Sequence, residues 1–244
     1  MSWFSGLKKK ELESIDFSVL KTDIHSHLIP GIDDGVQSLD ESLDLIFALQ
    51  GLGFSKIITT PHTMSDFYKN TPEIIISGRD DVQKDLDKLN RSIEFEAASE
   101  YYVDFDFQNK IDKKEFLTFA SKYLLIEFPF IDEPINIDET IFNLQLSGYN
   151  VVLAHPERYL YYELKDYERL TNKGVLLQLN LLSITGYYSP QVKKQAEKLI
   201  NADLVSFVGT DCHNMRQIEH LKECFTNPLW HKLLVSEKLL NKTL

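Results

Sequence analysis

The chain alternates short apolar segments with segments of helical periodicity, and this alternation restricts the possible fold more than any other feature. Seven short segments, of which 56–60 is a β-branched run, predict strands: 20–25, 56–60, 94–99, 123–126, 150–154, 175–180 and 204–208. Strands separated by helices are typical of βαβ units and a parallel sheet. Seven such units in 244 residues predict an α/β barrel, one strand short of the usual eight.

The composition fits one ordinary globular domain. Hydrophobic residues make up 43% and charged residues 26%, and no linker or compositional break interrupts the chain. We therefore expect a single domain over residues 21–244, preceded by an N-terminal extension at 1–20. The net charge of −11 argues against nucleic acid as a partner, because the protein's field repels a phosphate backbone. Two cysteines, no signal peptide and no run long enough to span a membrane predict a cytoplasmic location.

Histidines and acids follow six of the seven predicted strands, and Asn180 is the exception. Five of the seven histidines lie at these positions. The carboxyl ends of barrel strands converge on one rim, so we expect these side chains to share a pocket. They are His25, His27, His62, Glu100, Glu127, His155, Asp211 and His213.

Asp34, in the loop after the first strand, brings the set of candidate metal ligands to nine. We expect Asp34 to bind metal and its neighbour Asp33 to shape the turn. Nine ligands are too many for one tetrahedral ion and suit two or three hydrolytic metals with shared carboxylates. A mixed imidazole and carboxylate shell favours Mn, Fe or Zn over Mg or Ca.

The motifs at the strand ends resemble those of the PHP (polymerase and histidinol phosphatase) superfamily. They are His25-x-His27 with Asp34, Thr60-Pro-His62, Glu100, His155-Pro-Glu-Arg158 and Asp211-x-His213. More narrowly, the segments 25–35 and 153–159 are similar to those of bacterial PHP-type tyrosine-protein phosphatases that control capsular and exopolysaccharide synthesis. The resemblance covers roughly residues 21–216 and implies a distorted seven-stranded (β/α)7 barrel.

The resemblance also implies three divalent metals, Mn being preferred and Fe or Zn being alternatives. One metal would take His25, His27, Glu100 and Asp211. A second would take His62, Glu127 and His155 and share Glu100, and a third would take Asp34 and His213. The implied substrate is a phosphotyrosine protein, such as the tail of a bacterial tyrosine kinase.

The expected reaction is hydrolysis of a phosphate monoester by a hydroxide that bridges two metals. Arg158 follows His155 on the same loop and is expected to bind the phosphate through its planar guanidinium, although a salt bridge to a nearby acid is the alternative. Arg216 is a second candidate for the phosphate. Asp34 or His213 is expected to protonate or stabilise the leaving oxygen.

The same residues are also consistent with two other functions. A small-molecule phosphatase, for example one acting on histidinol phosphate, would use the same chemistry. A regulatory module that binds metal without catalysis is a third possibility. A thiol mechanism is rejected, because the loop around Cys212 lacks the glycine-rich spacing of a phosphate cradle, and we expect its side chain to be packed. Tyrosines crowd the same loops, either as walls of an aromatic pocket or as packing: Tyr101, Tyr102, Tyr159, Tyr161, Tyr162, Tyr187 and Tyr188.

Overall fold

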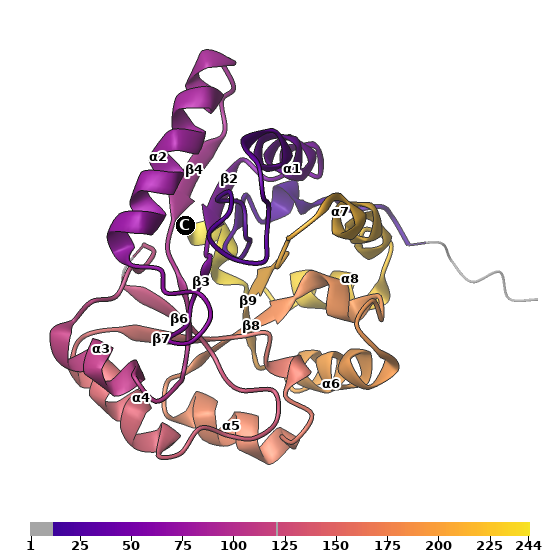
Figure 1. The fold of residues 1–244 in the computed structure, drawn as a ribbon. Coiled ribbons are helices and arrows are strands. Elements are labelled where there is room, and N and C mark those ends of the chain that lie inside the picture. Colours follow the sequence, from indigo (N-terminus) through magenta and orange to yellow (C-terminus); the bar gives the residue numbers. More distant parts are fainter. Residues whose placement is uncertain (1–11, 121) are drawn as a thin grey trace, which may run out of the picture.

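The computed structural model describes residues 12–120 and 122–244, and residues 1–11 of the expected N-terminal extension lie outside this range (Figure 1). Its strands lie at the centre and its helices surround them (Figure 1). The strands are β1 (Thr22–Asp23), β2 (Lys56–Thr59), β3 (His62–Thr63), β4 (Glu94–Ala97), β5 (Glu100–Tyr102), β6 (Tyr123–Glu127), β7 (Asn150–Ala154), β8 (Leu176–Asn180) and β9 (Val205–Gly209).

Eight α-helices lie within the described residues. They are α1 (Leu39–Gly51), α2 (Pro72–Lys88), α3 (Phe107–Lys113), α4 (Ile137–Leu146), α5 (Leu164–Asn172), α6 (Pro190–Asn201), α7 (Met215–Leu221) and α8 (Pro228–Val235). None of them combines the length and apolar character that crossing a membrane requires.

All of the paired strands are parallel, which confirms the predicted α/β class. The predicted closed sheet of seven strands does not match the pairing found in the described residues. They form a three-stranded sheet of order β1-β2-β4 and a six-stranded sheet of order β3-β5-β6-β7-β8-β9. The predicted strands 56–60 and 94–99 correspond to β2 and β4, and each is followed after a short break by a further strand that was not predicted, β3 and β5.

The split between the two sheets has a local cause at Pro61. Proline has no backbone N–H, so it cannot donate a hydrogen bond to a neighbouring strand. The Pro61 carbonyl still accepts the Glu100 N–H over 3.1 Å and also the Ser99 hydroxyl over 2.9 Å, and the Ser99 hydroxyl pairs with the Thr63 hydroxyl over 2.7 Å. Side-chain hydrogen bonds therefore add to the backbone bonds at the point where His62 and Glu100 begin the second sheet.

The first and last strands meet along a seam that joins the two ends of the chain. An isolated parallel bridge pairs Ser26 with Cys212, and the Asp211 N–H donates to the His25 carbonyl over 2.8 Å. Further down, the buried Asn241 side chain accepts from the Val208 N–H over 3.0 Å and donates to the Val208 and Thr22 carbonyls over 2.8 and 3.0 Å. An amide side chain thus takes the place of ladder hydrogen bonds at the lower end of the seam.

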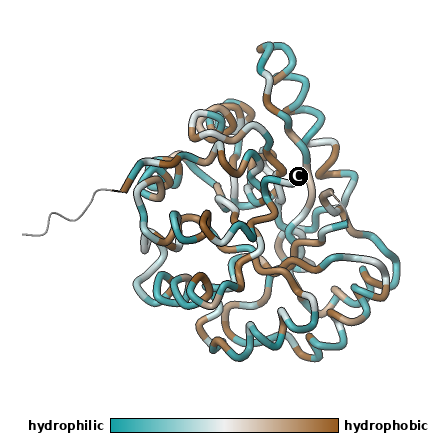
Figure 2. The backbone as a smooth tube through the Cα atoms, turned by 180° about the vertical axis from the view of Figure 1, so that it is seen from behind, coloured by the Kyte–Doolittle hydropathy of each residue, from teal (hydrophilic) through white to brown (hydrophobic). Residues whose placement is uncertain are grey.

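The core has two parts. The larger lies between strands and helices, and it includes the fully buried Phe17, which packs against Trp230 and so ties the described start of the chain to the C-terminal helices. The smaller is a set of apolar side chains from the strands and adjoining segments: Ile24, Ile58, Ala98, Phe119, Leu125, Val152, Ala154 and Phe207. Figure 2 shows hydrophobic colour along the central strands and mixed colour along the helices around them, as a sheet covered by amphipathic helices requires.

Candidate metal centre

The structure brings all nine predicted metal ligands together at the carboxyl ends of the strands. Four overlapping groups have ligand atoms within 4.8 Å of one another, and these groups together contain the nine residues. The groups are His27 with Asp34, His62 and His213; His25 with His27 and Glu100; His25 with His155 and Asp211; and His62 with Glu100 and Glu127. The convergence predicted from the strand ends is therefore present in the structure.

Glu100, the first residue of β5, lies at the centre of the cluster and is fully buried. Its Oε2 is 2.9 Å from His62 Nδ1, 3.4 Å from His25 Nε2 and 3.7 Å from His27 Nε2, while Oε1 is 3.0 Å from His155 Nε2. Oε2 has no hydrogen-bond partner among the described residues. A buried carboxylate that faces four imidazoles could serve as a metal ligand.

A second carboxylate, Asp211, faces the same imidazoles from the end of the β9 segment. Its Oδ1 is 3.4 Å from His25 Nε2 and 3.3 Å from His27 Nε2, and these two Nε2 atoms are 3.3 Å apart. The carboxylate oxygen and the two imidazole nitrogens lie in one small buried volume that suits a bound cation. Without a cation or a shared proton the two nitrogens would repel each other.

Two buried carboxylates of the cluster, Glu100 and Asp211, create a negative potential that favours a bound cation. Burial acts to lower the pKa of His25, but the charges of Glu100 and Asp211 outweigh it and raise the pKa to about 10. The same balance, with Glu100 dominant, raises the pKa of His62 to about 10. In the absence of another cation, protons on these imidazoles balance the negative charge of the buried carboxylates. A divalent metal would balance the same negative charge.

Two residues outside the ligand set fix the orientation of the first histidine pair. The Nδ1 of His25 lies 2.7 Å from Gln178 Oε1, and the Nδ1 of His27 lies 2.7 Å from Asp33 Oδ2. Each contact occupies Nδ1 and leaves Nε2 directed at the cluster. Asp33 also accepts from the backbone N–H groups of Gly35 and His62 over 3.0 Å, which agrees with its predicted role in the turn.

Asp34, His62 and His213 form the outer part of the cluster. Asp34 Oδ1 is 3.6 Å from His62 Nε2 and 3.5 Å from His213 Nε2, and its side chain is 52% exposed. The His213 ring stacks on the His27 ring with centroids 3.9 Å apart. This part of the cluster is the part open to solvent, where a substrate can approach.

Arg158, in the 3₁₀ turn Pro156–Arg158 after β7, lies beside the inner cluster. Its Nη1 is 3.3 Å from Asp211 Oδ2, so the salt bridge considered from the sequence is present. The guanidinium carbon lies 4.5 Å from the centroid of Phe130 and 5.0 Å from that of Tyr188. Held between two rings, the guanidinium still has N–H groups beyond the one that contacts Asp211.

Arg216 does not join the cluster. It is exposed at the start of α7 and lines a separate cavity of about 540 Å³ with Tyr187, Tyr188 and His220. Cys212 is fully buried, and burial raises the pKa of its thiol well above the ordinary range, in agreement with a packing role.

Sequence reasoning missed Gln178 and did not explain Asn180. Gln178 Nε2 donates to Asn180 Oδ1 over 3.0 Å, and Asn180 Nδ2 donates to Asp211 Oδ2 over 2.7 Å. Strand β8, the one without a predicted ligand, therefore connects His25 to Asp211 by hydrogen bonds. The signal was present in the spacing, since residues 178 and 180 share one face of a strand.

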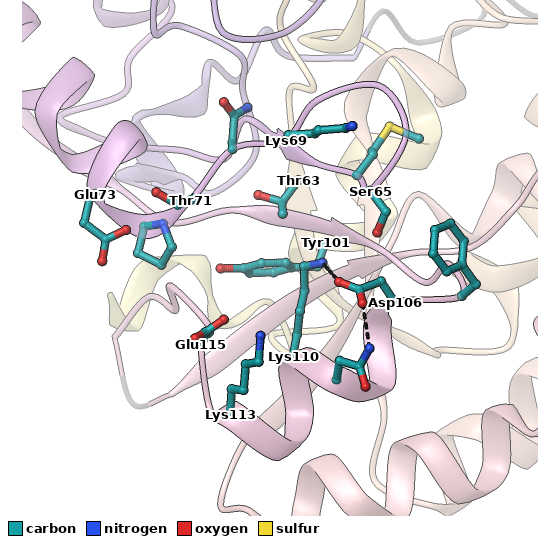
Figure 3. A pocket seen from close by; sticks show the side chains of 15 residues that line it. Thr63, Ser65, Lys69, Thr71, Glu73, Tyr101, Asp106, Lys110, Lys113 and Glu115 are labelled. Carbon is teal, nitrogen blue, oxygen red and sulfur yellow. Dashed lines mark hydrogen bonds and ion pairs between the residues drawn. The ribbon is translucent and has the colours of Figure 1, made fainter.

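A cavity of about 560 Å³ lies near the cluster, between the start of α2 and α3 (Figure 3). Lys69, Lys110 and Lys113 line it together with Glu73, Asp106 and Glu115, and Lys110 pairs with Asp106 (Figure 3). None of the nine predicted ligands lines this cavity. Its charges are balanced, so it does not select an ion of either sign.

The fold and the cluster together define a parallel α/β protein whose strand ends carry histidine and carboxylate groups that could hold metal. A family model described as capsular polysaccharide synthesis, CpsB/CapC, matches residues 21–232, and the chain belongs to this family.

Curated relatives carry the name tyrosine-protein phosphatase. YwqE of Bacillus subtilis is 32% identical over 199 residues, which cover 80% of this chain and 78% of YwqE. CpsB of Streptococcus agalactiae is 29% identical over 201 residues, covering 79% of this chain and 83% of CpsB. A crystal structure from a study of YwqE and of CpsB from Streptococcus pneumoniae, described as unique metal-dependent tyrosine phosphatases, matches with a TM-score of 0.76 and 30% identity. That match covers 91% of this chain and 94% of the other.

Proposed function

We propose that the chain is a metal-dependent protein-tyrosine phosphatase that acts in the control of capsular or exopolysaccharide synthesis. The observation that carries the proposal is the convergence of nine histidine and carboxylate side chains in a member of the CpsB/CapC family. The substrate that fits best is a phosphotyrosine segment of a bacterial tyrosine kinase, and a cytoplasmic location is part of the proposal.

The donor set supports two or three divalent ions, with Mn preferred and Fe or Zn as alternatives. His25, His27, Glu100 and Asp211 would hold one ion, and His62, Glu127 and His155 would hold a second that shares Glu100. Asp34 and His213 would hold a third, with His62 Nε2 near enough to contribute. When bound, the ions lower the pKa of a coordinated water and neutralise phosphate charge.

The protein's own residues bind and orient the phosphate monoester. Arg158 would donate its free N–H groups to phosphate oxygens, and its contacts with Phe130, Tyr188 and Asp211 hold the guanidinium in place. Asp34 or His213, at the open side of the cluster, would protonate or stabilise the leaving oxygen. A tyrosyl oxygen has a parent pKa near 10, so it needs less help than an alkyl oxygen.

We also propose that the fold is a distorted barrel, and the seam between β1 and β9 supports this proposal. Taken with the short breaks at Pro61 and Ser99, it suits a distorted seven-stranded barrel in which β2 with β3 and β4 with β5 each count as one strand. Residues 21–244 would form this single domain, and residues 1–20 would be an extension attached to it.

The test is hydrolysis by the metal-loaded protein of a phosphotyrosyl peptide and of histidinol phosphate. A preference for the peptide, with loss of activity in Arg158→Ala, supports the proposal. Arg79→Ala is a matched control, because the Arg79 side chain is 29% exposed against 28% for Arg158 and pairs with Asp80 on α2. A preference for histidinol phosphate would favour the small-molecule phosphatase, and absence of activity above the Arg158→Ala variant would favour the regulatory module.

A further inference from the structure

The loop after β6 exposes three large apolar side chains close to the metal cluster. Phe130 is 45% exposed, Ile131 93% and Ile135 90%. A single exposed apolar residue needs no explanation, but three within the six residues 130–135 of one loop indicate a surface that contacts another molecule. The loop begins directly after Glu127, one of the predicted metal ligands, so this surface adjoins the reaction site.

Phe130 is the member of this group that contacts the site itself. Its ring stacks with the His155 ring at 28° with centroids 5.8 Å apart, and the Arg158 guanidinium carbon lies 4.5 Å from its centroid. The aromatic ring therefore lies against one predicted metal ligand and against the group expected to bind phosphate.

We propose that Phe130 forms a subsite for the aromatic ring of the substrate. This inference rests on the proposed phosphatase function and adds the residue that selects an aryl over an alkyl phosphate. A phosphate held by Arg158 and the cluster places its ester group a few ångströms outward, next to the exposed part of Phe130. A phenyl ring there gains aromatic contact and removes apolar surface from water, whereas a short alkyl chain gains much less.

Four of the tyrosines near the cluster are poorer candidates for this role. Tyr101, Tyr159 and Tyr162 are 1%, 0% and 6% exposed, and they pack inside the protein, so the packing interpretation of these three is confirmed. Tyr188 lies on Arg158 but its hydroxyl is within 3.5 Å of Asp211 Oδ2 and 3.2 Å of Asn180 Nδ2, which ties it to the cluster's hydrogen bonds. Phe130 has no such polar group and keeps an exposed apolar surface.

The alternative role for Phe130 is to support Arg158 and nothing more. The two roles differ in what a substitution changes. If Phe130 only supports Arg158, its removal weakens every phosphate-like ligand equally. If Phe130 contacts the substrate ring, its removal weakens ligands that carry a ring and spares those that do not.

The experiment compares two phosphonates that differ only in the ring, phenylphosphonate and methylphosphonate. Their binding to Mn-loaded wild-type protein and to Phe130→Ala is measured by calorimetry, which does not depend on turnover. We expect Phe130→Ala to weaken phenylphosphonate about tenfold and to change methylphosphonate by less than about twofold. Phe130→Tyr should restore the preference for the ring.

Phe142→Ala on α4 is the control, because Phe142 is also a large exposed aromatic, at 63% exposure. Equal weakening of both phosphonates by Phe130→Ala, or no weakening of either, would overturn the ring subsite. Failure of the proposed function has a different result: the wild-type protein would then hydrolyse no phosphotyrosyl peptide, whatever the phosphonate affinities. The two inferences can therefore fail separately.

Discussion

Gln178 offers a direct test of how residues outside the ligand set support the metal centre. Its Oε1 lies 2.7 Å from His25 Nδ1, and both side chains are fully buried, so water does not replace the contact when it is removed. We consider Gln178→Met, which keeps the length of an unbranched side chain and removes both polar atoms. The substitution also removes the hydrogen bond to Asn180 and so loosens the connection to Asp211.

The magnitude follows from the cost of losing an orienting partner of a metal-bound histidine. Such losses reduce metal affinity by about 10- to 100-fold, or about 1.4–2.7 kcal/mol. At a saturating metal concentration the lost binding free energy lowers the free energy of unfolding by the same amount, because the metal binds only the folded protein. For a domain of this size we expect the metal-loaded protein to melt about 3–11 °C lower than wild type.

The assay is calorimetric titration of the metal-free protein with Mn, together with melting curves at fixed metal concentration. Gln83→Met, at a surface position on α2 where the side chain contacts Asp87, serves as the control. The melting curve of the metal-free Gln178→Met protein separates a packing defect from a metal effect. Metal affinity within twofold of wild type would refute the reasoning.

Three further predictions concern the cluster, the phosphate site and the seam. Glu100→Gln removes the charge that faces four imidazoles, so elemental analysis should find at least one metal fewer per chain, and an unchanged metal content would contradict the proposal that two ions share Glu100. Arg158→Lys keeps the charge but loses the planar fork, and KM for a phosphotyrosyl peptide should rise about tenfold in steady-state assays; an unchanged KM would argue against phosphate binding by Arg158. Asn241→Ala removes three buried hydrogen bonds across the seam and should destabilise the metal-free protein by about 2–4 kcal/mol in denaturant unfolding, whereas a loss below about 0.5 kcal/mol would show that the seam does not depend on Asn241.

The cluster could be predicted from the sequence because it depends on topology more than on detail. Each candidate ligand follows a recognisable apolar strand, and the carboxyl ends of parallel strands meet whatever the loops between them do. His25 and His213 are far apart in the chain, yet both positions follow from that one rule. Eight of the nine residues therefore did not require knowledge of a loop conformation, and Asp34, which lies in the loop after the first strand, is the exception.

The division of the sheet could not be predicted in the same way. The predicted strand 56–60 ends before Pro61, and the sequence does not show that pairing resumes at His62 with Glu100 or that the Ser99 hydroxyl donates to the Pro61 carbonyl. The partner of His25 was hidden for a similar reason. Gln178 is 153 residues away from it, and a neutral amide in a buried strand gives no sign of which side chain it will meet.

Phe130 shows a third limit. Three residues after Glu127 the chain is in a loop, where a two-residue period no longer assigns a side chain to one face. Its contact with Arg158 depends on two loops that follow different strands, β6 and β7. The sequence indicated tyrosines as possible walls of an aromatic pocket, whereas a ring that contacts both His155 and Arg158 belongs to Phe130.

The seam between β1 and β9 also has a consequence for the order of folding. His25 and His27 emerge early in the chain, but the aspartate that both face is almost two hundred residues further on, and Asn241 lies beyond it. Contacts of such long sequence separation are slow to form, since the intervening chain must first be ordered. The histidine pair therefore comes early in the sequence, but its contacts with Asp211 are among the last to form during folding. Uptake of metal during refolding should follow the slow phase in which the first and last strands pair.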